Sequence, residues 1–156
     1  MDRDQSARQF IEQVALHLEA SGLPLMAGRL LGLLLISNPP AQSSRQLIEQ
    51  LSASKGSIST NTRLLMRMAL VEKVAVPGSR STHFQVQPGA WEKLMEQQME
   101  HITNFRALLD EGLALIDTSP PPLRRRLEDT RDFYAFFEQE FPQLLHRWRT
   151  HQHQKK

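Results

Sequence analysis

The sequence predicts a mainly α-helical fold with one small β-hairpin near the middle of the chain. Apolar residues recur at helical spacing over most of the 156 residues, whereas strand-like alternation is confined to residues 70–86. Glycine and proline clusters separate the periodic segments and mark turns. With 40% hydrophobic residues, the chain can form one compact domain, or a small domain with additional dimerising helices.

The composition excludes several classes of protein. The chain contains no cysteine, which excludes a disulfide scaffold, a thiolate metal site and a cysteine-based redox sensor. The first residues are polar and mixed in charge, unlike a signal peptide. The longest apolar run, residues 30–36, is far shorter than the roughly 20 residues of a membrane span. We therefore expect a cytoplasmic protein with no membrane partner.

A first helix is predicted over residues 3–19. Phe10, Val14 and Leu18 recur every fourth residue and form a narrow apolar stripe. Gly22 and Pro24 end the helix, because glycine is a common C-cap and proline cannot continue a helix. Such a stripe suits a helix that lies across a partner subunit or the domain surface, so residues 1–21 are assigned to dimerisation or packing.

The next helix, residues 25–37, is apolar on nearly every side and is expected to be buried centrally. Gly28 and Gly32 lie four residues apart on one face, where the missing side chains let another helix approach closely. Arg29 is the sole charge of the segment, and its long side chain can reach solvent or a buried partner.

Residues 43–67 predict two short helices joined by a tight turn. Ser43 or Ser44 can cap the first helix and Ser54 the second, because a serine hydroxyl accepts hydrogen bonds from the free amides at a helix start. The second helix has an apolar stripe formed by Ile58, Thr62, Leu65 and Ala69. Its opposite face carries small, hydroxyl-bearing or basic residues: Gly56, Ser59, Thr60, Arg63 and Arg67.

This polar face has the chemistry of a nucleic-acid contact. The like charges of Arg63 and Arg67, four residues apart, repel by roughly a few tenths of a kcal/mol, and a polyanion would remove the repulsion. Gly56 lets a nucleic-acid backbone come close, and N–H groups at a helix start bind phosphate. Such a face is typical of a recognition helix in a DNA major groove, although an ordinary solvated helix would also present it.

Two short strands follow the second helix. Residues 70–76 alternate as a strand does, residues 77–80 form a turn, and residues 82–86 return. Arg80 then lies at the hairpin tip, where it can reach a neighbouring minor groove or phosphate. Within residues 43–86, six Lys and Arg oppose two Glu, which gives +4 in a chain whose total is +2. The positive charge is therefore concentrated on the part that would face a polyanion.

Residues 22–91 resemble the winged helix-turn-helix of MarR-type transcriptional regulators, and the stretch from Gly28 to Leu34 narrows the resemblance to the GbsR-like branch. The motifs that carry it are Ser54-Lys55-Gly56-Ser57-Ile58-Ser59 at the start of the second helix, Leu70-Val71-Glu72-Lys73-Val74 in the first strand, and Pro77-Gly78-Ser79-Arg80 in the turn.

The resemblance implies a dimeric bacterial regulator, often a repressor, and some members of the family sense small molecules such as choline. It implies that residues 22–90 form the DNA-binding domain and that Arg29 is a candidate phosphate contact. The chain departs from the family at the hairpin, where an Asp usually stands two residues before the wing Arg. Gly78 occupies that position, so no Asp braces Arg80.

The predicted DNA contacts form three groups: phosphate anchors at Ser54, Lys55, Gly56 and Ser57; base readers at Ser59, Thr60 and Arg63, with Asn61 less well placed; and backbone or minor-groove contacts at Arg67, Lys73 and Arg80. Two-fold symmetry would give a pseudo-palindromic operator in double-stranded DNA, with half-sites about one helical turn apart. The alternative is a winged helix that docks a protein, because fold alone does not fix function.

A long helix is predicted from about residue 90 to 116 or 117, and a final helix from about residue 123, which Pro142 kinks or restarts. At ~1.5 Å per residue the long helix measures about 40 Å, too long for so small a domain to cover its apolar stripe. A second copy of the chain is the simplest cover, so residues 91–156 are assigned to dimerisation and a homodimer is expected.

Most aromatic residues lie in these last two helices, and we interpret them first as a dimer core. The family resemblance also implies an effector pocket, in which Trp91 and Tyr134 would line an aromatic cage for a quaternary ammonium ligand. No catalytic constellation, phosphate loop or metal-ligand cluster is recognisable, so we predict no enzyme activity, no cofactor and no dedicated metal site.

Overall fold

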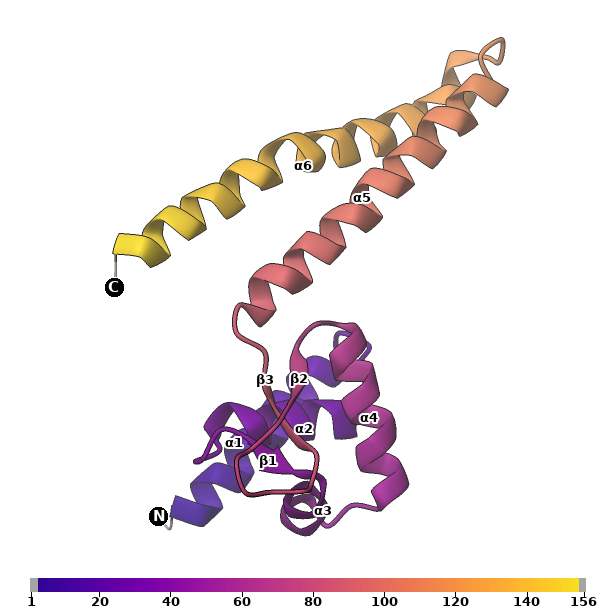
Figure 1. Cartoon of the computed structure of the whole chain (residues 1–156). Helices are drawn as coiled ribbons and strands as arrows, with labels where there is room; N and C mark the ends of the chain where they lie inside the picture. Colours follow the sequence, from indigo (N-terminus) through magenta and orange to yellow (C-terminus); the bar gives the residue numbers. More distant parts are fainter. Residues whose placement is uncertain (1–2, 155–156) are drawn as a thin grey trace. The chain divides into compact units, whose positions relative to one another are not determined.

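The computed structural model describes residues 3–154 and confirms the mainly helical fold with a β-hairpin. The elements along the chain are α1 (Arg3–Glu19), α2 (Leu25–Ile36), β1 (Gln42–Ser43), α3 (Ser44–Leu51), α4 (Lys55–Arg67), β2 (Val71–Val74), β3 (His83–Val86), α5 (Ala90–Leu115) and α6 (Pro121–Gln154) (Figure 1). The chain divides into two compact units, and the boundary falls inside α5: the first unit ends at Leu94 and the second begins at Met95.

Helix α2 forms the centre of the first unit, as its apolar sequence predicts. Leu30 and Leu31 have no exposed surface. The same core contains Leu47 from α3, Ile58 and Leu65 from α4, and Phe84 from β3. Each such side chain stabilises the fold by about 1.5–3 kcal/mol relative to an exposed one.

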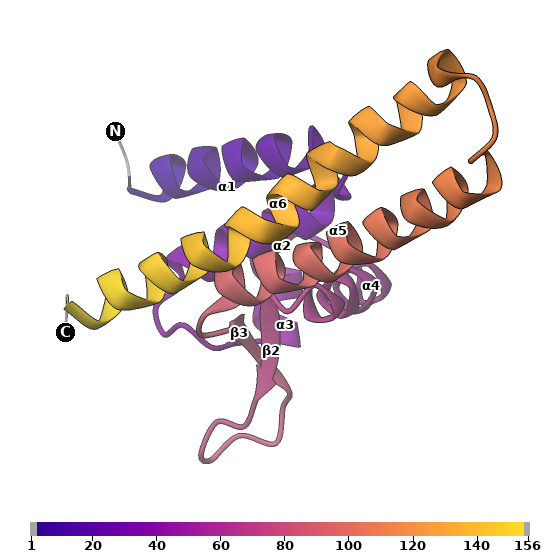
Figure 2. The ribbon, with the colours of Figure 1, turned by 90° about the horizontal axis from the view of Figure 1, so that it is seen from above.

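Helix α1 packs on α2 through the two glycines (Figure 2). A Cβ atom added at Gly28 would lie 2.6 Å from the Cα atom of Ala15, so no side chain fits between the helices there. Ala15 is fully buried, whereas Phe10 is 39% exposed. The centre of the contact is therefore displaced by one residue from the predicted stripe of Phe10, Val14 and Leu18, because the glycines admit only a small residue.

A three-stranded antiparallel sheet in the order β1-β3-β2 forms the base of the wing. β2 pairs with β3 along its whole length, with Val71 opposite Val86. The first strand is shorter than the predicted residues 70–76, and residues 75–82 form one loop. Strand β1 was not predicted, because two residues are too few to show an alternating pattern.

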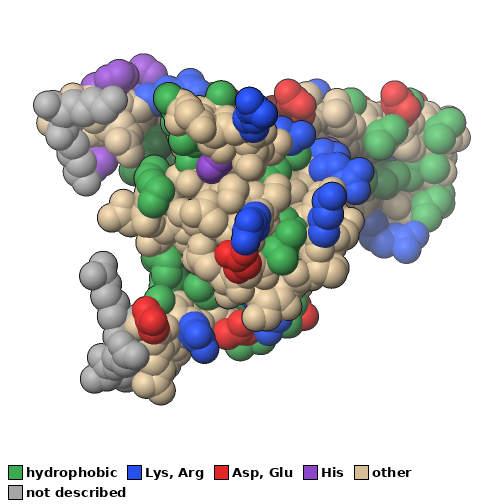
Figure 3. Space-filling model, turned by 60° about the horizontal axis from the view of Figure 1, so that its bottom comes forward, with side chains coloured by type: hydrophobic (Ala, Val, Ile, Leu, Met, Phe, Trp, Pro, Cys, Tyr) green, Lys and Arg blue, Asp and Glu red, His purple; other side chains and the backbone are tan. Residues whose placement is uncertain are grey.

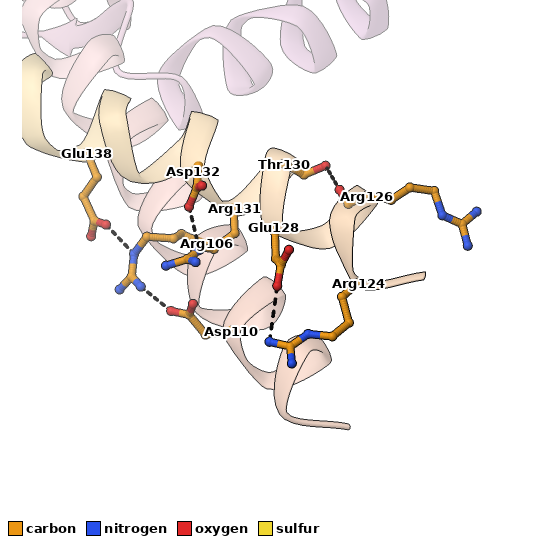
Figure 4. Close-up of polar contacts among 9 residues, drawn as sticks. All are labelled: Arg106, Asp110, Arg124, Arg126, Glu128, Thr130, Arg131, Asp132 and Glu138. Atoms are coloured by element: carbon orange, nitrogen blue, oxygen red, sulfur yellow. Dashed lines mark hydrogen bonds and ion pairs between the residues drawn. The ribbon is translucent and has the colours of Figure 1, made fainter. Parts of the chain in front are cut away.

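Helices α5 and α6 form most of the second unit. Arg106 of α5 bonds to Asp110 on its own helix and to Glu138 of α6 (Figure 4). Arg149 of α6 lies 2.5 Å from Glu96 of α5, Nη2 to Oε1. These ion pairs join the two helices at points far apart in the sequence.

Helix α6 begins at Pro121 and passes Pro142 without a break, so the predicted restart there is wrong. Proline is favoured in the first turn of a helix. An internal proline removes its own N–H bond and its ring crowds the carbonyl four residues back, but the hydrogen bonds of the turns on either side can continue the helix. No helix within residues 3–154 is both long and apolar enough to cross a membrane.

The aromatic residues of the second unit cluster along α6 and against α5. The rings of Phe105 and Tyr134 meet edge to face with centroids 4.9 Å apart, and the rings of Phe133 and Phe137 are equally close. Phe133 and Phe136 nevertheless remain 60% exposed. The second unit therefore carries large apolar side chains that a single chain does not cover.

Replacing Gly28 by alanine tests the contact between α1 and α2. The added methyl group would meet the α1 backbone, so we expect the free energy of unfolding to fall by about 1–3 kcal/mol. The matched control is Gly56→Ala, since a Cβ atom at Gly56 has only Ser54 Oγ nearby, at 3.9 Å. That variant should be unchanged or more stable by up to about 1 kcal/mol. Urea unfolding followed by circular dichroism measures both, and equal stabilities would contradict the close packing.

Candidate DNA-binding surface

Helix α4 begins at the cap that the sequence predicts. The Ser54 hydroxyl accepts a hydrogen bond from the Ser57 amide at 3.1 Å. Such a cap stabilises a helix by about 1 kcal/mol. Lys55 and Gly56 follow in the first turn and are both exposed. The start of α4 thus combines one exposed cation with the positive end of a helix dipole.

The two faces of α4 differ as predicted. Ile58, Thr62 and Leu65 are buried against the core. The Thr62 hydroxyl donates to the Ile58 carbonyl oxygen at 2.7 Å, so its polar atom is satisfied inside the protein. The other face is exposed and carries Gly56, Ser59, Thr60, Arg63 and Arg67.

Asn61 lies on the buried side of α4, which corrects its prediction as a base reader. It is 8% exposed, and its side-chain Nδ2 donates to the Ser57 carbonyl oxygen at 2.9 Å. The reason is angular: three residues after Ile58, at about 100° per residue, Asn61 returns to within about 60° of the buried stripe. Its amide therefore holds the helix rather than a ligand.

The cations of α4 remain available to an anion. Arg63 Nε donates to the Ser59 carbonyl oxygen at 3.2 Å, which orients the guanidinium along the exposed face. Arg67 and Lys55 make no hydrogen bond or ion pair through their side chains with any residue in the range 3–154. The repulsion predicted between Arg63 and Arg67 is thus not relieved by an acidic neighbour in the described chain.

The acidic residues of this region are engaged elsewhere. Glu49 pairs with Arg45, Oε1 to Nε, at 2.8 Å, and this hydrogen bond together with the carboxylate charge raises the pKa of the Arg45 guanidinium. Glu72 accepts a hydrogen bond from Gln85 across the wing at 2.9 Å. Figure 3, with the end that carries α3 and the wing loop turned forward, shows Lys and Arg side chains spread over this face, with some Asp and Glu side chains among them.

The wing loop carries Arg80 without fixing it. Gly78 adopts a φ of +80°, and the Ser79 amide donates to the Val76 carbonyl oxygen at 3.0 Å, so the turn itself is well defined. Arg80 is exposed, and its side chain has no hydrogen bond or ion pair among residues 3–154. Lys73 on β2 is also exposed. The missing Asp of the wing therefore leaves Arg80 unbraced, as the sequence predicts.

The base of the wing is tied to the start of α3, a contact that the sequence did not reveal. The Ser44 amide donates to the Thr82 carbonyl oxygen at 3.3 Å, beside the pairing of β1 with β3. Ser43 also caps α3, with a reciprocal bond between its backbone and the Gln46 side chain. One serine pair thus joins the wing to the helix-turn-helix, and the only sequence signal was the cap.

Arg29 is held inside the first unit. Its Nε lies 2.8 Å from Glu12 Oε1 of α1. The sequence left open a phosphate contact, a solvent-facing side chain and a buried partner. It did not identify Glu12 as that partner, because a pair 17 residues apart leaves no periodic signal. Since the charge is already paired, we leave Arg29 out of the proposed DNA contacts.

The two residues predicted to line an effector pocket belong to different units. Trp91, in the first unit, is 50% exposed. Tyr134, in the second unit, packs against Phe105 and Phe133. A pocket that contains both rings stays a prediction. Among the described residues, no group of three or more His, Asp or Glu is placed to hold a metal ion.

Comparison with known proteins identifies the family. Residues 89–151 match the family model for MmpR5-like MarR family transcriptional regulators. The chain is 36% identical to the HTH-type transcriptional regulator MmpR5 of Mycobacterium tuberculosis over 148 residues. This aligned region covers 95% of this chain and 90% of that protein. A crystal structure of a transcriptional regulator, also 36% identical, superposes with a TM-score of 0.81 over 93% of this chain and 99% of that one.

The family model and the relative are both MmpR5-like members of the family; neither shows the narrower GbsR-like resemblance, which stays a prediction. Proteins of this family regulate transcription and are not enzymes, in agreement with the sequence. The chain is a transcriptional regulator of the MarR family.

Proposed function

We propose that the chain binds a pseudo-palindromic operator in double-stranded DNA as a homodimer and represses the adjacent gene until a small-molecule effector releases it. The observation that carries the proposal is the exposed face of α4. There Arg63 and Arg67 stand beside Ser59 and Thr60 with no acidic partner among residues 3–154. Membership in a family of transcriptional regulators supports the same function.

In this proposal Arg63 is the main base reader. A guanidinium can bond a guanine through two parallel N–H groups, and the bond from Arg63 Nε to Ser59 limits how far its fork can swing. Ser59 and Thr60 add hydroxyls to the same face. Phosphates would lie at the start of α4, against Lys55, Gly56 and the capped turn of Ser54 and Ser57, and against Arg67, Lys73 and Arg80.

The proposed homodimer is supported by the uncovered apolar side chains of the second unit. Aromatic rings on α6 and leucines on α5 are exposed; Leu108, for example, is 60% exposed. A second copy that covers them would remove this apolar surface from water and so stabilise the dimer. Two copies related by a two-fold axis would present two α4 helices to half-sites about one helical turn apart.

The first experiment is to select bound fragments from a genomic DNA pool with the purified protein at about 0.15 M salt, where non-specific binding is weak. A two-fold symmetric motif would support the dimeric regulator, and a reporter under that motif would separate repression from activation. Recovery of no motif would favour the alternative of a protein-docking winged helix.

Salt dependence separates the two functions independently of any sequence motif. Affinity for DNA should fall with salt at a log–log slope of about −0.9 for each phosphate neutralised. A docking module that binds DNA only incidentally would show a shallow slope and no preference for the selected motif.

Replacing Arg63 by alanine should remove base recognition. We expect the selected operator to lose about 1–3 kcal/mol of preference over unrelated DNA, which is about 5- to 150-fold in affinity ratio. The matched control is Asn61→Ala: its buried amide bonds only α4, so this variant should lose stability but keep the operator preference. Fluorescence anisotropy titrations measure both ratios, and an Arg63→Ala protein with the parent's preference would remove α4 from the proposal.

Replacing Arg67 by alanine should act differently from Arg63→Ala. Loss of a phosphate contact weakens binding to all sequences about equally and reduces the salt slope by about one. Arg80→Ala should behave in the same way if the wing contacts the backbone. A change of sequence preference in the Arg67→Ala protein would contradict its role as a phosphate contact.

The effector part of the proposal has its own test. Choline is the first probe, because the family resemblance suggests it and aromatic rings attract quaternary ammonium groups. Choline should weaken operator binding by the parent protein, and Trp91→Ala and Tyr134→Ala should each abolish that response. An unchanged response in both variants would exclude these rings from the pocket.

A further inference from the structure

We propose that Gln87 is a positioning residue, which fixes the end of α4 to the first turn of α5 and thereby sets the spacing at which two half-sites are bound. The proposal rests on the dimeric operator binding proposed above. All of the contacts that carry it lie within the first unit.

Gln87 stands between β3 and α5 and bonds to both sides of this connection. Its backbone amide donates to the Leu70 carbonyl oxygen at 2.9 Å. Its side-chain amide lies between the Ala69 carbonyl oxygen and the Lys93 ammonium. Only the orientation with the amide nitrogen toward Ala69 satisfies both groups: the nitrogen then donates to the Ala69 carbonyl oxygen at 3.0 Å, and the amide oxygen accepts from the Lys93 ammonium at 2.5 Å. One side chain therefore connects the exit of α4 to the first turn of α5.

The Ala69 end of this connection is a place where the backbone needs a restraint. Ala69 follows α4 closely and adopts a φ of +55°, in the left-handed region that residues with a Cβ atom rarely occupy. Such a conformation persists only where the surroundings hold it. The bond from Gln87 to the Ala69 carbonyl is one such restraint, so it helps to define the direction in which the chain leaves α4.

The Lys93 end lies on a helix turn that belongs to the DNA-binding unit. Ala90 is 2% exposed, and Leu94 packs against the same core as α4. These apolar contacts hold α5 against the unit but are not directional, whereas hydrogen bonds fix an orientation. The bonds of Gln87 therefore add a directional restraint on the rotation of the first turn of α5 relative to α4.

This rotation matters because α5 continues without interruption from Ala90 to Leu115, into the unit that carries the exposed aromatic residues. In a two-fold dimer the separation of the two α4 helices depends on the angle between each α4 and its own α5. Loss of the Gln87 side-chain bonds should leave each α4 able to bind a half-site. The dimer should then tolerate more than one spacing between the two half-sites.

The test measures affinity for four duplexes: the selected operator, the same operator with one central base pair added, the same with one removed, and a single half-site. The variant is Gln87→Met, which keeps the side-chain length and removes both polar atoms. Its spacing preference, the affinity ratio between the natural and altered operators, should fall by about tenfold, within the usual range of coupling between sites. Its affinity for the single half-site should stay within about twofold of the parent, because the DNA-facing residues are untouched.

The matched control is Gln85→Met, on β3 and two residues before Gln87. Gln85 bonds to Glu72 within the wing and does not reach α5, so its loss should leave the spacing preference unchanged. Lys93→Met provides a second variant should Gln87→Met fail to fold by circular dichroism. It removes the other half of the bond. Any phosphate contact of Lys93 would lower the affinities for the natural and altered operators equally and therefore cancel in their ratio.

A parent-like spacing preference in a folded Gln87→Met or Lys93→Met protein would overturn the role of Gln87, as would an equal loss in Gln85→Met. A parent protein that binds the operator no better than the half-site would instead overturn the proposed dimeric binding. The two failures are therefore distinguishable.

Discussion

Helix α2 has no face suited to water, and the first unit is built around the need to cover it. Leu30 and Leu31 are fully buried, and α1 closes one side at Gly28, where the small residue Ala15 lies against the α2 backbone. Helices α3 and α4 and strand β3 cover the rest. Because α4 gives its apolar stripe to this core, its opposite face must point away from the unit. The exposure of Arg63 thus follows from the burial of Ile58.

The features that the sequence predicted well are those decided within a few residues. The caps at Ser43 and Ser54 and the two faces of α4 depend on helical periodicity and on the local chemistry of serine, and both were confirmed. The misplaced features depend on contacts between distant residues. The pairing of Arg29 with Glu12 and the addition of β1 to the sheet leave no pattern in either segment alone.

Asn61 and Phe10 show a second limit of sequence reasoning, which is angular resolution. Both residues lie near the border between two faces of a helix, where a shift of one position decides burial. Contacts with neighbouring residues decide which of these side chains is buried. At the glycines of α2 the small Ala15 packs in place of Phe10, and Asn61 donates a hydrogen bond to the Ser57 carbonyl oxygen of its own helix. A polar residue at such a border can therefore serve the helix as easily as a ligand. The contacts proposed for Arg63 and Arg67 do not share this ambiguity, since both lie well inside the exposed face.

The boundary between the two units falls within a continuous helix and not within a loop. Where the boundary between two domains lies in a loop, an insertion is often tolerated, because the loop absorbs the extra residue. A helix cannot do this: one residue added between Leu94 and Met95 would turn everything beyond it by about 100° and advance it by about 1.5 Å. The apolar stripe of α5 and the residues that anchor its first turn must therefore keep one phase along the helix. An insertion within α5 therefore changes the direction in which its apolar stripe faces as well as the length of the helix.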